Sequence, residues 1–201
     1  MDIEQRCFRS AITIDDSPDQ PRITGYAAIF DAESEDLGGW REIIRPGAFS
    51  GVLGGDTRAL VNHNSDLLLG RTLSGTLALS EDALGLRYEI RPPDTQYARD
   101  LMVSLKRGDL DQSSFAFQVE KDIWQPPAEG RQYPLRVIER IGRLYDVSPV
   151  VYPAYPQTSA EARSMALSLA SSGQATGEAQ EQAAVRRRSL LRKHLDLSER
   201  E

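Results

Sequence analysis

Hydrophobic and polar residues alternate along much of the first 152 residues, the two-residue period of strands with one buried face. The clearest case is residues 113–119 (SSFAFQV), in which Phe115 and Phe117 fall on one face. Turn-forming residues such as Asp15-Asp16-Ser17-Pro18 separate the alternating segments. The strands predicted in this way are residues 8–14, 22–30, 72–79, 85–91, 113–119, 135–141 and 144–152.

One segment has helical rather than alternating spacing. In residues 95–107, Tyr97, Leu101 and Leu105 recur every four residues, and Gly108 follows as a C-terminal cap. A second, short helix is expected to follow Arg45-Pro46 and to end near Gly51 or Gly54-Gly55. Many short strands with one or two helices predict an α+β fold, built as a closed or nearly closed β-barrel.

The composition changes after residue 156. Residues 157–184 are rich in Ala, Ser, Gln, Glu and Gly and contain little to bury, whereas residues 185–194 (VRRRSLLRKH) are basic with the spacing of a short amphipathic helix. We therefore expect a folded domain over residues 1–156 and a flexible tail over residues 157–201. The tail's basic residues suit either docking onto an acidic partner or a plainly solvated charge run.

Charge and cysteine content exclude several classes of protein. The 201 residues carry a net charge of −6, which argues against a dedicated nucleic-acid-binding protein. One cysteine and two histidines rule out a disulfide within the chain and a Cys/His zinc cluster, and no metal or organic cofactor is expected. Neither a signal peptide nor an apolar run long enough for a membrane span is visible. The expected location is a reducing cytosol.

The common catalytic signatures are absent, including G-x-S-x-G, the Walker A loop, H-E-x-x-H and G-x-G-x-x-G. Acid–base chemistry near neutral pH favours histidine, and the chain offers only His63 and His194. His63 follows an apolar run that would fix it, whereas His194 lies in the tail. Cys7 is a nucleophile in principle, but its alternating segment favours a small strand residue facing the core.

Two neighbouring serines are the candidate nucleophiles. If Phe115 and Phe117 pack in the core, Ser114 points to the opposite face together with the small Ala116. A shift of one residue in the strand register would expose Ser113 instead. An ordinary strand serine is the alternative interpretation of either residue.

Several segments, taken in order, resemble the HK97-type phage prohead (capsid maturation) protease family. The resemblance covers roughly residues 22–156 and rests on GYAAIF (25–30), IRPGAF (44–49), LVNHN (60–64), LGRT (69–72), SFAF (114–117) and DVSPVVYPA (146–154). The specificity of the resemblance comes from the order of the whole set and not from any single segment. The family is similar to the herpesvirus assemblins, and this implies an assemblin-like β-barrel with flanking helices.

The resemblance also implies a catalytic role for three residues. Ser114 would attack the scissile carbonyl, His63 would accept and return its proton, and Asp146 would orient His63. The family often has Glu where this chain has Asp146, so Glu139 and Asp111 remain alternative acids. Candidates for an arginine that helps to stabilise the oxyanion are Arg71, Arg140 and Arg143.

The implied function is that of a serine endopeptidase acting in the host cytoplasm, inside the assembling prohead. Its expected partners are the major capsid protein, with its scaffold or delta segment, and the protease itself, through self-cleavage and possible oligomerisation. Self-cleavage would remove the tail. A non-enzymatic scaffold protein with the same barrel, or a ligand-binding barrel with an apolar lumen, are the alternatives.

Overall fold

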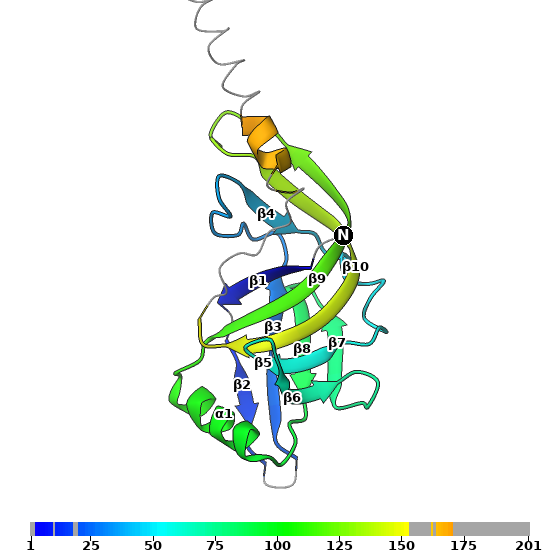
Figure 1. Ribbon diagram of the computed structural model, residues 1–201, viewed down its shortest axis with the longest axis vertical. Helices are drawn as coiled ribbons and strands as arrows, with labels where there is room; N and C mark the ends of the chain where they lie inside the picture. The colour runs from blue at the N-terminus through cyan, green and yellow to red at the C-terminus, as the bar shows by residue number, and fades with distance from the viewer. Residues whose placement is uncertain (1–2, 10, 18–19, 153–161, 163, 171–201) are drawn as a thin grey trace, which may run out of the picture.

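The computed structural model describes residues 3–9, 11–17, 20–152, 162 and 164–170 (Figure 1). These residues form an α+β structure that is mostly β-sheet. The named elements are β1 (Glu4–Arg9), β2 (Thr13–Asp15), β3 (Arg22–Ile29), β4 (Arg41–Ile44), β5 (Arg58–Val61), β6 (Asn64–Arg71), β7 (Leu77–Glu81), β8 (Gly85–Ile90), α1 (Gln96–Arg107), β9 (Gln112–Gln125) and β10 (Leu135–Val150). Residue 162 and residues 164–170 are also helical.

The strands belong to two sheets. The first has the order β1-β9-β10-β5-β6, and β4 pairs with another part of β10. Within it, β10 runs parallel to β4 and β5, and the other pairs are antiparallel. The second sheet is antiparallel with the order β2-β3-β8-β7. The long strands β9 and β10 pair along their length and curve together from the end near β4 toward α1 (Figure 1).

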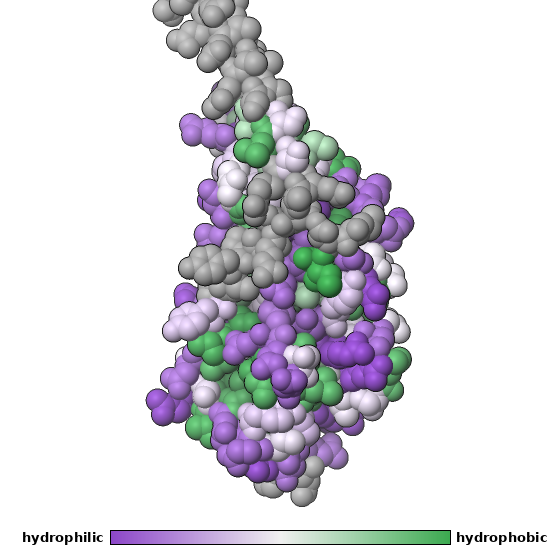
Figure 2. Space-filling model, viewed as in Figure 1, coloured by the Kyte–Doolittle hydropathy of each residue, from purple (hydrophilic) through white to green (hydrophobic). Residues whose placement is uncertain are grey.

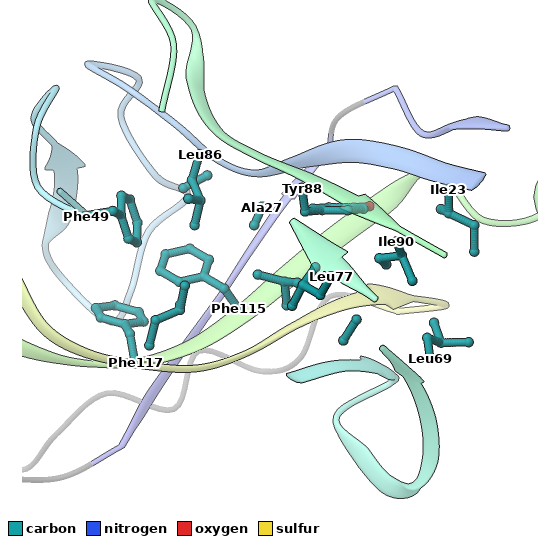
Figure 3. Packing of buried hydrophobic residues seen from close by; sticks show 14 of the residues in the cluster. Ile23, Ala27, Phe49, Leu69, Leu77, Leu86, Tyr88, Ile90, Phe115 and Phe117 are labelled. Carbon is teal, nitrogen blue, oxygen red and sulfur yellow. The ribbon is translucent and has the colours of Figure 1, made fainter. Parts of the chain in front are cut away.

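The main hydrophobic core lies between the two sheets. Tyr88 and Ile90 of β8 and Ile23 of β3 pack in one cluster with Phe115 and Phe117 of β9, and all five are completely buried (Figure 3). This confirms that the phenylalanines of β9 face the core. The rings of Phe115 and Phe117 are stacked, with their centroids 4.6 Å apart.

The predicted closed barrel is not formed by the described strands. Closure requires a continuous ladder of hydrogen bonds around the sheet. Here the first sheet ends at β1 and β6 and the second at β2 and β7, and the two sheets meet through side chains instead. In the described part of the chain, α1 and the short helix at 164–170 do not amount to a shell of helices around a barrel.

Several predicted elements are confirmed. The helix predicted over residues 95–107 is α1, and Gly108 ends it with a φ of 76° while its N–H donates to the Leu105 carbonyl. Strand β3 lies within the predicted residues 22–30. Strands β7 and β8 pair as the predicted hairpin, although β7 covers residues 77–81 and not the predicted 72–79. Residues 113–119 lie inside the longer strand β9.

Other boundaries were predicted wrongly. The segment after Arg45 forms successive turns rather than a helix, because glycines at 47, 51, 54 and 55 interrupt it. The strand predicted at residues 8–14 divides between β1 and β2, which belong to different sheets. The two strands predicted over residues 135–152 are the single strand β10, which passes through Gly142 with shifts in register.

A small second cluster lies where β4 meets the far ends of β9 and β10. The helical residues Ala162 and Ala166 are buried with Leu37 and Trp40, and Trp124 packs against them. Their helix is the orange ribbon near β4 in Figure 1. Of these residues, Ala162 and Ala166 belong to the part of the chain predicted as a tail. The basic segment 185–194 lies outside the described residues.

The viewed surface of the described residues is a mixture of hydrophobic and hydrophilic side chains (Figure 2). Among these residues, no helix combines the length and the apolar character needed to cross a membrane.

Candidate active site

The strand register places Ser114 and Asp146 on one face of the first sheet. Ser114 of β9 lies opposite Ser148 of β10, and Ala116 lies opposite Asp146. Directly opposed residues of an antiparallel pair point to the same side of the sheet, as do residues two apart along a strand. Ser114, Asp146 and Ser148 therefore share the face opposite the phenylalanines.

His63 reaches this face from the turn between β5 and β6. Val61 pairs with Asn64, so Asn62 and His63 are the two central residues of the hairpin, with φ angles of 52° and 56°. Two consecutive positive φ angles are typical of a type I′ turn, and asparagine tolerates this conformation well. A histidine there carries local backbone strain.

Hydrogen bonds attach this turn to the end of β10. The Asn62 N–H donates to the Pro149 carbonyl at 3.0 Å, and the Asn62 side-chain oxygen accepts from the Val151 N–H at 2.9 Å. Because β10 also carries Asp146, these bonds set the position of the His63 backbone relative to the carboxylate. The strained turn is thus held to the end of β10 by both the main chain and the side chain of Asn62.

The three side chains form a continuous chain of hydrogen bonds. His63 Nδ1 lies 2.6 Å from Asp146 Oδ1, and His63 Nε2 lies 2.6 Å from Ser114 Oγ. The His63 and Asp146 side chains are 11% and 10% exposed, and Ser114 is completely buried. In a site with so little water, such a chain can move a proton from the hydroxyl to the imidazole while the carboxylate stabilises the resulting cation.

Ser114 Oγ has a second neighbour on β1. The carbonyl oxygen of Arg6 lies 2.9 Å away and accepts a hydrogen bond from the hydroxyl. A serine has only one proton to donate, so the Arg6 carbonyl and His63 Nε2 compete for it. Strand β1 therefore takes part in setting the direction of the Ser114 O–H bond.

Ser113 is separated from this arrangement by its position on the core face of β9. Its hydroxyl lies 2.8 Å from the phenol oxygen of Tyr88, and both residues are completely buried. Burial raises the pKa of Tyr88 above its ordinary value. The register of β9 thus places Ser114, and not Ser113, beside His63.

The alternative acids pair with other side chains. Glu139 forms an ion pair with Lys121 at 2.7 Å, and Asp111 lies 3.2 Å from Arg9 with both partners exposed. The carboxylate that contacts His63 is that of Asp146.

The three candidate arginines are also engaged by other groups. Arg71 makes two hydrogen bonds, of 2.6 and 2.7 Å, to Asp56. Arg140 belongs to an exposed ion pair, and the Arg143 guanidinium lies 4.6 Å from the centre of the Tyr145 ring. These contacts do not single out any of the three as an oxyanion donor.

Cys7 lies on the same face as Ser114 rather than in the core. The two residues are directly opposite each other on β1 and β9, and the Cys7 thiol donates to the Gln112 side-chain oxygen at 3.3 Å. The expectation of a core-facing cysteine is therefore wrong. Partial burial raises the pKa of Cys7 to about 11, and the charge of Asp111 adds to the effect. The thiol is accordingly protonated and unreactive near neutral pH.

Sequence reasoning assigned no role to Ser148. Its hydroxyl donates to Asp146 Oδ1 at 2.8 Å and accepts a hydrogen bond from the His63 backbone N–H at 3.3 Å. The spacing Asp-Val-Ser within a strand would have placed Ser148 beside Asp146. Its contact with His63 joins residues 85 positions apart, and spacing within one strand does not predict such a contact.

In the described part of the chain, no three His, Cys, Asp or Glu side chains converge in the way that metal ligands do.

Comparison with known proteins supplies the family. No curated protein and no solved structure matches the chain. A family model described as caudovirus prohead serine protease matches residues 10–171, which include the three side chains of the site. The match covers most of the 201 residues. The chain therefore belongs to the prohead serine protease family of the caudoviruses, the serine peptidases of phage capsid maturation.

Proposed function

We propose that this protein is a serine endopeptidase that uses Ser114 as nucleophile, His63 as general base and Asp146 as the acid that orients the histidine. The observation that carries the proposal is the pair of 2.6 Å contacts that His63 makes, one with each of the other two side chains. This is the arrangement of nucleophile, base and orienting group that activates a serine hydroxyl.

The proposed reaction follows from these contacts. Ser114 Oγ attacks the scissile carbonyl carbon as its proton passes to His63 Nε2. Asp146 accepts the hydrogen bond of Nδ1–H and stabilises the imidazolium that forms. The imidazolium then protonates the leaving amine as the peptide C–N bond breaks. A water molecule, deprotonated by the same nitrogen, hydrolyses the acyl-enzyme and restores Ser114.

The proposed substrates are capsid-protein delta segments and scaffold inside the assembling prohead, followed by the protease itself. The family assignment supports a role beside phage capsid proteins. We propose that residues 1–156 form the catalytic domain and that the chain after residue 156 is a tail. This tail is the proposed substrate of self-cleavage. Residues 171–184, which follow the helical segment, are all small or polar and suit an extended peptide.

Co-expression with the cognate major capsid protein tests the proposal. The native protein, Ser114→Ala and Ser113→Ala would be compared by mass spectrometry of the products. Ser113→Ala is the matched control, since it removes the neighbouring hydroxyl from the opposite face of the same strand. We expect capsid and tail fragments with the native protein and with Ser113→Ala, and none with Ser114→Ala.

Two outcomes would contradict the proposal. Equal cleavage by the native protein and Ser114→Ala would show that another group is the nucleophile. Assembly of shells by all three proteins without any cleavage would favour the alternative, a non-enzymatic capsid assembly protein.

A further inference from the structure

The Ser148 hydroxyl occupies a fully buried position between two parts of the candidate site. It donates to Asp146 Oδ1 at 2.8 Å and accepts from the His63 backbone N–H at 3.3 Å. The hydroxyl therefore forms a bridge between the Asp146 carboxylate and the main chain of His63, and the ring of His63 contacts the same carboxylate.

The bridge limits how the carboxylate can rotate. Asp146 Oδ1 accepts both the Ser148 hydroxyl and His63 Nδ1–H, the latter at 2.6 Å. Rotation of the carboxylate away from the imidazole would break both bonds together. A carboxylate in a nearly dry site must have its acceptor positions filled, so Ser148 stabilises the orientation in which Oδ1 faces His63.

The second bond of Ser148 acts on the histidine. His63 lies in a strained turn with a φ of 56°, and its N–H is directed at Ser148 Oγ. The same hydroxyl thus connects the strained backbone of the proposed base to the side chain that orients its ring. Because His63 Nε2 must stay within hydrogen-bonding distance of Ser114, a small rotation of this turn would weaken the contact.

We propose that Ser148 is a positioning residue, whose buried hydroxyl holds the Asp146 carboxylate and the His63 backbone in the geometry that activates Ser114. This inference rests on the proposed function. Ser148 does not contact the reacting atoms, and it acts through Asp146 and His63.

The rate at which a fluorophosphonate probe labels Ser114 tests this role without any knowledge of the substrate. We expect Ser148→Ala to label about 10- to 100-fold more slowly than the native protein, the effect of losing a buried hydrogen bond to a charged group. Ser148→Thr, which keeps the hydroxyl, should recover most of the rate. Ser113→Ala is the matched control and should label at nearly the native rate, since its hydroxyl bonds to Tyr88 in the core.

A spectroscopic measurement separates positioning from a general loss of stability. In the native protein, the proton of His63 Nδ1 should give a downfield resonance in the NMR spectrum, because it is shared with Asp146 over 2.6 Å. We expect this resonance to shift or to broaden by exchange in Ser148→Ala and to remain in Ser113→Ala. If Ser148→Ala does not fold, Ser148→Cys replaces it, because a thiol of similar size is only a weak donor.

The possible outcomes distinguish the inference from the function on which it rests. Native labelling of Ser114 together with an unchanged rate and an unchanged resonance in Ser148→Ala would overturn the inference alone. Absence of labelling in the folded native protein would overturn the proposed nucleophile and the positioning role with it.

Discussion

Two adjacent serines on β9 have different hydrogen-bond partners because their side chains point to opposite faces of the strand. Ser114 contacts His63, and Ser113 contacts the buried Tyr88 on the other face. Sequence reasoning could separate them because Phe115 and Phe117 identify the core face by alternation. It could not find the role of Ser148, whose bond to the His63 main chain joins residues 85 positions apart.

The cysteine on the site's face gives a prediction at this same scale. Because partial burial raises the pKa of Cys7 from 9.0 to about 11, about 100-fold less thiolate is present near pH 8 than in an exposed thiol. We expect iodoacetamide to modify native Cys7 at least about 100-fold more slowly than the same cysteine in the protein unfolded in urea. The native rate should rise as the pH increases toward 11.

Mass spectrometry measures this rate without ambiguity, since Cys7 is the single cysteine of the chain. Equal rates in the native and unfolded proteins would show that the thiol is neither buried nor affected by Asp111.

At the scale of elements, the sequence predicts strands whose two faces differ and fails where other parts of the chain determine the structure. Alternation located β3, the hairpin of β7 and β8, and the centre of β9. The short strand β4 was not predicted, because three of its four residues are buried and no alternation is left to see. The continuity of β10 through Gly142 depends on its pairing with β9, which local sequence does not encode.

The short helix at residues 164–170 provides the prediction for this scale. Ala162 and Ala166 are the buried residues of this helical segment and pack with Leu37 and Trp40, so we expect this contact to hold the helix in place. Ala166→Glu would place a charge in the buried contact, and we expect the helix to detach. Trp40 and Trp124 are the only tryptophans of the chain, and both belong to this cluster. Detachment should therefore shift the intrinsic fluorescence to longer wavelength.

Leu167→Glu is the matched control, because Leu167 lies on the same helix with 61% of its surface exposed. Its emission should stay at the native wavelength. An unshifted spectrum in Ala166→Glu would show that the helix does not depend on this contact.

At the scale of the whole molecule, buried ion pairs connect β1 to β4 and to the first residues of β10. Arg6 of β1 pairs with Glu4 and Glu42, and Arg136 of β10 also pairs with both glutamates. Both guanidinium groups lie 5.8 Å from the centre of the Trp40 ring. Although burial opposes it, bonding to Glu4 and the charges of Glu4 and Glu42 raise the pKa of Arg136.

This network reaches the candidate site through Arg6. The side chain of Arg6 is fixed by the two glutamates, while its carbonyl accepts the hydrogen bond of Ser114. The family match begins at residue 10, so neither β1 nor this carbonyl belongs to the matched part of the chain. The surroundings of the proposed nucleophile therefore depend partly on charges that lie on the other face of β1.

Removing one partner of this network should destabilise the whole fold. Glu42→Ala leaves the buried guanidinium groups of Arg6 and Arg136 without one of their two shared carboxylates. We expect the free energy of unfolding in urea to fall by about 3–5 kcal/mol, the cost of an uncompensated buried charge. Glu120→Ala is the matched control, since it breaks only an exposed pair with Arg140 and should cost no more than about 1 kcal/mol. A loss in Glu42→Ala as small as in the control would mean that the remaining carboxylates, or water, compensate both arginines. In that case, the ion pairs with Glu42 would not be needed to keep β1 beside Ser114.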